Sequence, residues 1–267
     1  MNGDLSRYSN PLPSSLACNG CASSHYQTNG YGNMLAVTFN GNRNFYSGGT
    51  TLLWDASAAG PAQTVPGWPS GYTVSGITLN PSTKRLYVSA SKGTPTENKI
   101  VIYNIAPTAN ATPGAPIKLT ELDVSAQPGW SIQGPSMPGD IVIDSANTAG
   151  RTPNRVFAYL RGTGGLISFT DDGVSVPSAA SLSTIGLGSI PSSASDVIAT
   201  GYKIVYDPRS DLVWGVSREA RVVFSIDPVT FQIVQKPTPA GFHGLWILPT
   251  GTFFAIDRAN LRVYLGR

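Results

Sequence analysis

The hydrophobic positions of the chain recur in a unit of three short runs, and this unit is repeated five times. Each unit has an apolar run, a tight polar turn, an aromatic-rich run and a second apolar run closed by Asp, Asn or Thr. Runs this short, bounded by turn residues, predict β-strands rather than helices. In chain order the runs are 35–39, 45–46 and 52–55; 77–81, 86–88 and 100–104; 141–144, 156–159 and 166–170; 204–208, 212–214 and 222–227; and 245–248, 253–257 and 261–264.

Five such units predict an all-β fold. A repeat of roughly 40–50 residues built from short strands is typical of a β-propeller, because one small sheet cannot bury its faces without neighbours. Two further runs, 117–122 and 231–235, alternate apolar with polar residues and predict an outer fourth strand. We therefore expect a five-bladed β-propeller of four-stranded antiparallel blades, with blades at about 32–68, 72–126, 138–180, 200–236 and 242–267.

The same pattern predicts the domain organisation. Residues 32–267 are expected to form a single propeller domain, and residues 1–31 an N-terminal arm. The fifth unit has no run for a fourth strand after residue 264, so we expect the arm to close the last blade with a strand within residues 5–16. The Ser-, Ala-, Gly- and Pro-rich segments 108–116 and 178–195 are expected to be exposed loops.

The second and fourth units resemble a known repeat. Residues 79–89 read LNPSTKRLYVS and precede KIVIYN at 99–104, and residues 206–215 read YDPRSDLVWG before RVVFSIDP at 221–228. These segments resemble the repeats of the YVTN and NHL-type β-propellers, and the resemblance extends over roughly residues 32–267. It implies the propeller fold and no particular activity, because this fold carries unrelated functions.

Charge and hydropathy exclude two classes of partner. Only 12 % of the residues are charged, against about 25 % in an average protein, and the net charge is +3. The 18 basic residues are spread along the chain without a run, so we expect no nucleic-acid partner. No stretch approaches the ~18 consecutive apolar residues of a membrane-spanning helix, so we expect no membrane partner. No cofactor is expected.

Carboxylates are the first candidates for chemistry, because glycosidases need two of them about 5–9.5 Å apart. The chain has three glutamates, none on a predicted innermost strand: Glu97, Glu121 and Glu219. Glu97 is expected in a loop. Asp140, Asp144 and Asp207 lie around predicted first strands, where a pair would be near the central channel, but turn capping is the commoner role of Asp at such positions. We expect no catalytic residues.

A metal or a disulfide is the second possibility. Cys18, Cys21 and His25 lie within eight residues and carry thiol and imidazole groups, which are the usual zinc ligands. A structural zinc site needs a fourth ligand, so these three residues are weak metal candidates. Cys18 and Cys21 are also a candidate disulfide around an Asn-Gly turn, and two free thiols in a loop are the remaining alternative.

Aromatic side chains in loops are candidates for binding a glycan, because a flat ring can stack on a sugar. Trp68 and Trp130 both follow Pro-Gly, and Tyr72 lies close to the first of them. We take these three as candidate binding residues. The alternative is that each loop tryptophan fills the space between neighbouring blades.

No catalytic set stands out, so the sequence favours a structural or interaction role and no enzyme activity. With few charges and many Gly, Ser, Thr and Asn residues, we predict a bacteriophage tail protein located in the virion, with other structural subunits as partners in an oligomeric assembly. One alternative is an extracellular carbohydrate-binding propeller lectin. The other is a secreted propeller lyase or hydrolase.

Overall fold

The computed structural model describes most of the predicted strands and the turns next to them. The described residues are 2–4, 36–39, 43–47, 51–54, 63–80, 82–93, 96–105, 114–124, 138–144, 154–160, 165–186, 204–217, 220–242, 244–247, 252–257, 260 and 262–266. Within them no helix has the length and apolar character needed to cross a membrane.

The described strands form five four-stranded antiparallel sheets. The first sheet contains β2 (Ala36–Phe39), β3 (Arg43–Ser47), β4 (Leu52–Trp54) and β5 (Gln63–Thr64). The second contains β6 (Thr73–Asn80), β7 (Arg85–Gly93), β8 (Thr96–Asn104) and β9 (Ile117–Asp123). The third contains β10 (Pro138–Asp144), β11 (Arg155–Leu160), β12 (Gly165–Thr170) and β13 (Ser183–Gly186).

The fourth sheet contains β14 (Ile204–Asp207), β15 (Leu212–Ser217), β16 (Val222–Ile226) and β17 (Ile233–Pro237). The last sheet contains β18 (Gly244–Ile247), β19 (Phe253–Asp257) and β20 (Arg262–Gly266), and its fourth strand is β1 (Asn2–Asp4). The predicted all-β class with four-stranded antiparallel sheets is therefore confirmed.

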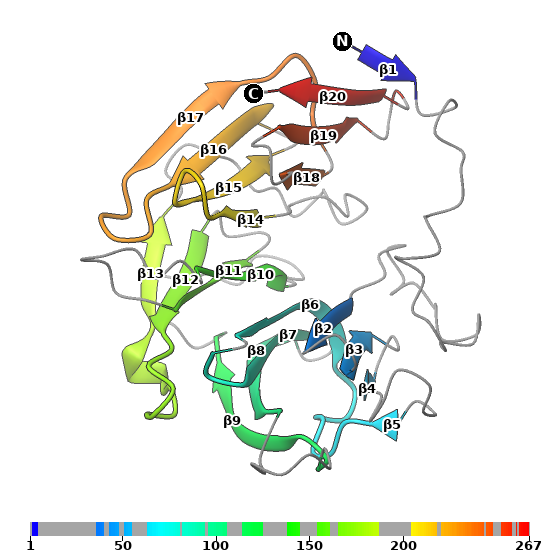
Figure 1. Cartoon of the computed structure of the whole chain (residues 1–267), viewed down its shortest axis with the longest axis vertical. Coiled ribbons are helices and arrows are strands. Elements are labelled where there is room, and N and C mark those ends of the chain that lie inside the picture. The colour runs from blue at the N-terminus through cyan, green and yellow to red at the C-terminus, as the bar shows by residue number, and fades with distance from the viewer. Residues whose placement is uncertain are drawn as a thin grey trace.

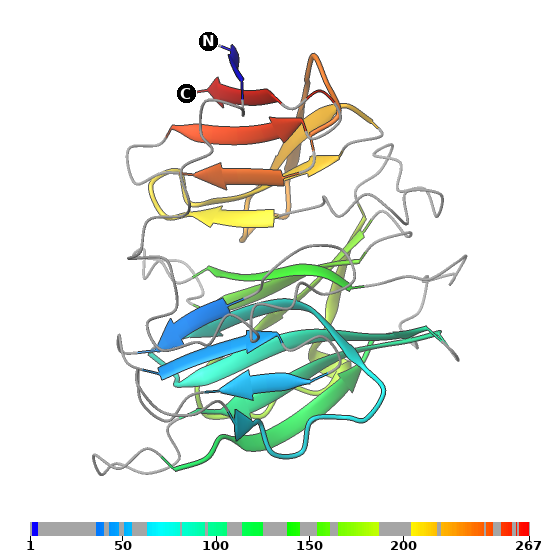
Figure 2. The ribbon, with the colours of Figure 1, turned by 90° about the vertical axis from the view of Figure 1, so that its right-hand side faces the viewer.

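The sheets follow one another in chain order along an arc (Figure 1). Neighbouring sheets contact each other largely through their first strands, β2 with β6, β6 with β10, β10 with β14 and β14 with β18. The outer strands β9, β13 and β17 lie on the outside of the arc (Figure 1). Both ends of the chain lie at the last sheet (Figure 2).

An apolar cluster lies between each sheet and the next. Tyr87 and Ile102 of the second sheet meet Val156 of the third in one such cluster. Leu86 and Val88, the chain neighbours of Tyr87, belong instead to the cluster shared with the first sheet. Because successive side chains on a strand point to opposite faces, β7 is buried on both sides. This burial explains why its sequence reads as a continuous apolar run rather than an alternating one.

The turns after Asn80 and Asp207, each between a first and a second strand, share one construction. Asn80 Oδ1 accepts a hydrogen bond from the Ser82 N–H at 3.0 Å, and Asp207 Oδ1 accepts one from the Arg209 N–H at 3.1 Å. These bonds fix the start of each turn by mimicking a backbone turn. The residue just before the second strand has a left-handed backbone in three sheets: Lys84 (φ 58°), Asn154 (φ 61°) and Asp211 (φ 55°).

The expectation of a loop over residues 178–195 is wrong for its first half. The structure places there a 3-10 helix, η3 (Ala179–Ser181), and the strand β13, which pairs with β12 as the fourth strand of the third sheet. That sheet therefore extends past residue 180. Ile185 is 5 % exposed and joins the cluster between the third and fourth sheets, so one apolar residue anchors a strand of otherwise small side chains.

Two other expectations on outer strands need correction. The strand expected at 231–235 begins at residue 233, because Phe231 adopts a left-handed backbone (φ 58°) in the preceding turn and packs edge-on against Phe157, with ring centroids 6.5 Å apart. Glu97 lies on β8 and not in a loop.

The last sheet is completed from the N-terminal arm. In β1, Asn2 is opposite Tyr264 and Asp4 is opposite Arg262 of β20. The strand expected within residues 5–16 falls outside the described residues, and the strand that pairs with β20 precedes it in the chain.

Candidate functional site

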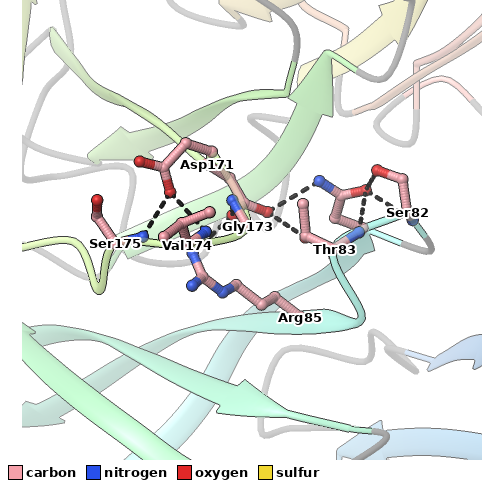
Figure 3. Close-up of polar contacts among 9 residues, drawn as sticks. Ser82, Thr83, Arg85, Asp171, Gly173, Val174 and Ser175 are labelled. Carbon is pink, nitrogen blue, oxygen red and sulfur yellow. Dashed lines mark hydrogen bonds and ion pairs between the residues drawn. The ribbon is translucent and has the colours of Figure 1, made fainter. Parts of the chain in front are cut away.

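Asp171 is the centre of a polar cluster between the second and third sheets (Figure 3). It follows β12, and its side chain is fully buried. Oδ1 accepts hydrogen bonds from Arg85 Nη1 at 2.7 Å and from the Gly173 N–H at 3.1 Å. Oδ2 accepts from Asn80 Nδ2 at 2.8 Å and from the Thr83 hydroxyl.

The Asp171 carboxylate is fully occupied by these contacts. An ionised carboxylate has about four lone-pair sites, and four donors from its own chain surround this one. Three of the donors come from the end of β6, the β6–β7 turn and the start of β7. The cluster therefore joins two sheets and leaves no acceptor for a substrate.

A contact of another kind, between an arginine and an aromatic ring, joins the third and fourth sheets. Arg155 begins β11 as Arg85 begins β7, and its guanidinium lies 4.8 Å from the centroid of the Phe231 ring in the fourth sheet. Its Nη1 also donates to Ser168 Oγ at 3.3 Å. Burial lowers the pKa of Arg155, and the charge of Asp144 acts in the opposite direction. Each arginine thus extends from one sheet to the loop between the third and fourth strands of the next.

Two of the three aspartates expected near a central channel, Asp144 and Asp207, are buried. Asp144 is 1 % exposed and Asp207 is 7 % exposed. Asp207 caps its turn, and its Oδ2 accepts a second hydrogen bond from Ser210 Oγ at 2.7 Å. The hydroxyl of Tyr206 donates to Asp211 at 2.8 Å. Burial raises the pKa of Tyr206 well above its usual range, and the neighbouring carboxylates add to this effect.

The other acidic candidates are Asp140 and Glu219. Asp140 lies on β10. Glu219 lies outside the described residues.

A second cluster occupies the other end of the second sheet, where β7 and β8 meet. Tyr72 precedes β6 and is 3 % exposed, and its hydroxyl donates to a carboxylate oxygen of Glu97. The ammonium groups of Lys99 and Lys92 lie 4.9 Å and 5.8 Å from the centroid of its ring. Burial raises the pKa of Tyr72, and its hydrogen bond to Glu97 acts in the same direction.

Glu121 on β9 joins this cluster to the outer strand. It accepts from Lys99 Nζ at 2.9 Å and from Lys118 Nζ at 2.7 Å. Burial alone would raise the pKa of Glu121, but the two lysines outweigh burial and leave it below its ordinary value. The hydrogen bond to Glu121 raises the pKa of Lys99. We call Lys92, Lys99 and Lys118 the lysine rim.

Residues 65–72, the connector between the first and second sheets, rest on the stems of two of these lysines. Gly67 and Gly71 have left-handed backbones, with φ of 71° and 80°. A Cβ at Gly67 would lie 3.4 Å from Lys118 Cε, and one at Gly71 would lie 3.7 Å from Lys92 Cε. The apolar stems thus pack beneath the connector, as long charged side chains commonly do.

The two predicted glycan-binding aromatics that the structure describes, Trp68 and Tyr72, do not form an open platform. The exposure expected for Tyr72 is wrong, because its ring belongs to the cluster between the first and second sheets and two ammonium groups flank it. Trp68 is half-buried and packs against the same cluster, as in the alternative in which it fills the space between blades. Trp130 lies outside the described residues.

The predicted metal and disulfide residues cannot be placed on this site. Cys18, Cys21 and His25 all lie outside the described residues. Among the residues that the structure does describe, no group of three or more His, Cys, Asp or Glu side chains is arranged to hold a metal ion.

Arg85, Asp171, Lys92 and Lys99 were not predicted from the sequence as cluster residues. A weak signal for the arginines was present, since three successive second strands begin with Arg: Arg43, Arg85 and Arg155. For the lysines, the signal was the alternation of side chains between the two faces of β7 and β8. On one face of each strand the apolar residues give way to a lysine, which marks the point where the strand passes beyond the core.

No family model matches the chain, and no curated protein sequence matches it. Solved structures do resemble it. A proposed 6-phosphogluconolactonase from Bacteroides uniformis aligns over 86 % of this chain and 64 % of its own, with 17 % identity and a TM-score of 0.53. A protein of unknown function from Bacteroides thetaiotaomicron aligns over 87 % and 57 %, with 12 % identity and a TM-score of 0.52.

The β-propeller domain of a Myceliophteria thermophila protein aligns over 85 % of this chain and 67 % of its own, with 10 % identity and a TM-score of 0.52. The chain has the β-propeller fold. The resemblance inferred from the YVTN- and NHL-like segments is thereby confirmed at the level of the fold. The chain spans less than two thirds of the length of the two Bacteroides proteins, and at these identities the likeness establishes no activity.

Proposed function

We propose that the five sheets are the blades of a five-bladed ring, and that β1 closes the last blade. Four apolar clusters between consecutive sheets and the pairing of β1 with β20 support this proposal. The blades supply rigid rims and loops for contacts with partners. A chain without residues 1–4 should melt at a lower temperature than the full chain, and an unchanged melting temperature would count against closure by β1.

We propose that the protein is a non-catalytic structural propeller within a larger assembly, and that the assembly is a bacteriophage virion, with this chain in the tail. One observation supports the non-catalytic part of this proposal: buried aspartates of the protein form hydrogen bonds within the fold. Asp171 and Asp207 accept hydrogen bonds from their own turns or from the neighbouring sheet. The low charge content and the many Gly, Ser, Thr and Asn residues support placing the chain in an assembly.

The physical reason is access. A general acid or base must come within hydrogen-bond distance of the group that it protonates or deprotonates. The side chain of Asp144 is almost entirely covered, and that of Asp171 is covered completely. Each of these carboxylates therefore stabilises the fold. A catalytic carboxylate, in contrast, would have to contact the substrate.

Four measurements test this function. Analytical ultracentrifugation over a wide concentration range, with electron microscopy of the same samples, should reveal rings, tubes or defined oligomers, and mass spectrometry of purified phage particles should detect the chain. Assays with lactone and glycoside substrates should detect no turnover. A turnover that disappears in Asp144→Asn or Asp207→Asn, in protein that still melts normally, would overturn the proposal. So would a monomer at every concentration that is absent from particles.

A further inference from the structure

Among the described residues, all of the large aliphatic side chains that are exposed lie toward one face of the propeller. Successive strands of each sheet run in opposite directions, so the first-to-second turn and the third-to-fourth connection emerge on the same face. The exposed residues lie where a third strand ends or a fourth begins, in four consecutive sheets. Each is 45–86 % exposed: Ile117, Val174, Val176, Val229, Val234 and Leu265. We call this side of the molecule the apolar face.

Contacts between sheets place the two kinds of turn next to each other. A Cβ at Gly173, in the β12–β13 loop, would lie 3.0 Å from Thr83 Cγ2 in the β6–β7 turn. Val174 follows Gly173 at this contact (Figure 3). In the next pair of sheets, Phe231 from the β16–β17 turn lies beside Arg155, the first residue of β11. The loops of the apolar face therefore rest on the turns of the neighbouring sheet.

Hydrogen bonds to two aspartates hold two of the valines in place. Asp172 Oδ1 accepts from the N–H of Val174 at 2.8 Å and from the following N–H at 2.7 Å. Asp227 Oδ1 accepts from the N–H of Val229 at 2.8 Å and from the following N–H at 3.0 Å. In two consecutive sheets, an aspartate thus fixes the backbone of an exposed valine two residues later. A loop that is already ordered loses less entropy when a partner binds.

The difference between the two faces indicates which contact buries these residues. Single exposed aliphatic residues are ordinary on a protein surface, but here the six exposed ones of the described chain share one face. A head-to-tail stack of copies would set this face against the opposite, polar one. A face-to-face pair sets aliphatic residues against aliphatic residues, and homodimer interfaces are more apolar than other interfaces.

Charge and area are also compatible with such a pair. Exposed charges of both signs lie in the turns and loops of the apolar face: Lys84, Asp172 and Arg209. In a two-fold contact a cation of one copy can therefore meet the aspartate of the other. A stable contact covers about 800 Å² per partner, which is about 6 % of the 12949 Å² surface of this chain. Part of one face is enough.

We propose that the apolar face binds the same face of a second copy of this chain, with Val174 and Val229 as principal contacts. The inference rests on the proposed function and deepens it, because it names the partner and the surface of one contact in the assembly. A contact of a face with itself closes at two copies. Larger assemblies then need other surfaces or other subunits.

Sedimentation of the full chain over a range of concentrations tests the proposal, and it should show a dimer as the largest species. Val174→Asp should weaken the dimer at least tenfold, since a carboxylate would be buried in an apolar contact. Because Val174 is 86 % exposed, the dilute variant should melt like the unmodified monomer. The matched control is Ser70→Asp, which adds the same charge and should leave the dimer unchanged. Ser70 is exposed in the connector 65–72, whose Gly71 contacts Lys92 of the lysine rim at the other end of the second sheet.

Three results would overturn the proposal. Equal weakening by Val174→Asp and Ser70→Asp would mean that both ends of the sheets take part in the contact. Growth past two copies would mean that the chain stacks head to tail. A monomer at every concentration would exclude the second copy as the occupant. If Val174→Asp then also removed the chain from phage particles, the apolar face would bind a different subunit.

This inference and the proposed function can fail separately. A chain that is monomeric alone but present in phage particles would refute the face-to-face pair and leave the structural function standing. A chain that forms dimers through Val174, but is absent from particles, would refute its placement in the virion and leave the pair standing.

Discussion

Removal of the Asp171 carboxylate is a direct test of how neighbouring sheets are joined. Asp171→Ala leaves the Arg85 guanidinium without its counter-charge in a position that is 5 % exposed. Breaking a buried ion pair by removal of one partner costs about 3–5 kcal/mol, because the remaining charge is buried without compensation. We therefore predict a loss of about 3–5 kcal/mol in the free energy of unfolding.

The predicted loss follows from what the carboxylate contacts. Besides Arg85, the carboxylate accepts from the side chains of Asn80 and Thr83, and these donors lose their acceptor in the same substitution. Asp171→Asn keeps the shape, but it also leaves Arg85 without its counter-charge and replaces one acceptor oxygen with a donor, so its cost should fall in the same range, about 3–5 kcal/mol. For a domain of this size, the alanine variant should melt roughly 6–20 °C below the unmodified protein.

Urea unfolding followed by tryptophan fluorescence measures these free energies, and a double-mutant cycle separates the pair from its surroundings. Arg85→Met removes the guanidinium and keeps much of its apolar stem. The double variant should be more stable than the sum of the two single losses predicts, because neither charge is then left buried alone. Asp172→Asn is the matched control, since Asp172 is the exposed neighbour and binds only its own loop through Val174 and Ser175.

Two results would refute this reasoning. If Asp171→Ala destabilises no more than Asp172→Asn, the buried cluster does not hold the second and third sheets together. If the single losses add in the double variant, the ion pair contributes nothing beyond the packing of its two side chains.

Three further substitutions test particular contacts. Gly215→Ala places a Cβ 2.3 Å from Phe224 Cζ, so urea unfolding should show a loss of about 1–3 kcal/mol that Phe224→Leu partly restores. Lys84 has φ 58°, and Lys84→Gly should relieve a left-handed strain of roughly 1 kcal/mol and raise the melting temperature; a decrease would contradict this. The lowered pKa of Glu121 implies stability that is present above about pH 4.3 and lost as the pH falls through the folded value, so acid titration should destabilise the unmodified chain more than Glu121→Gln.

The strands were predictable where hydrophobic residues dominate. The three inner strands of the second, third and fourth units are visible in the sequence because their apolar runs are buried between the neighbouring sheets. The strand β13 is not, since Ile185 is its only large apolar residue and its neighbours are small residues common in loops. The start of β17 was misplaced for a different reason. Phe231 looks like a strand residue, but its left-handed backbone puts it in the turn.

The polar clusters could not be predicted from the sequence, because they bring together residues that are far apart in the chain. Asp171 and Arg85 are 86 residues apart in the chain and meet only after two sheets have packed together. Tyr72 was misread as an exposed ring because its Pro- and Gly-rich surroundings are typical of a surface loop. The connector instead crosses the end of the second sheet, and its tyrosine enters the core.

The arrangement of the cores predicts where the fold opens first. The second, third and fourth sheets each share an apolar cluster with both neighbours, whereas in the described residues the first and last sheets share one each. In an array supported only by contacts between neighbours, the least supported unit opens most readily. Removal of residues 1–4 should therefore accelerate amide hydrogen exchange in β20, which loses its partner strand, and leave exchange in β7 and β8 unchanged. If exchange accelerates equally in all three strands, the sheets open as one cooperative unit, and a stability assigned sheet by sheet is the wrong description of this fold.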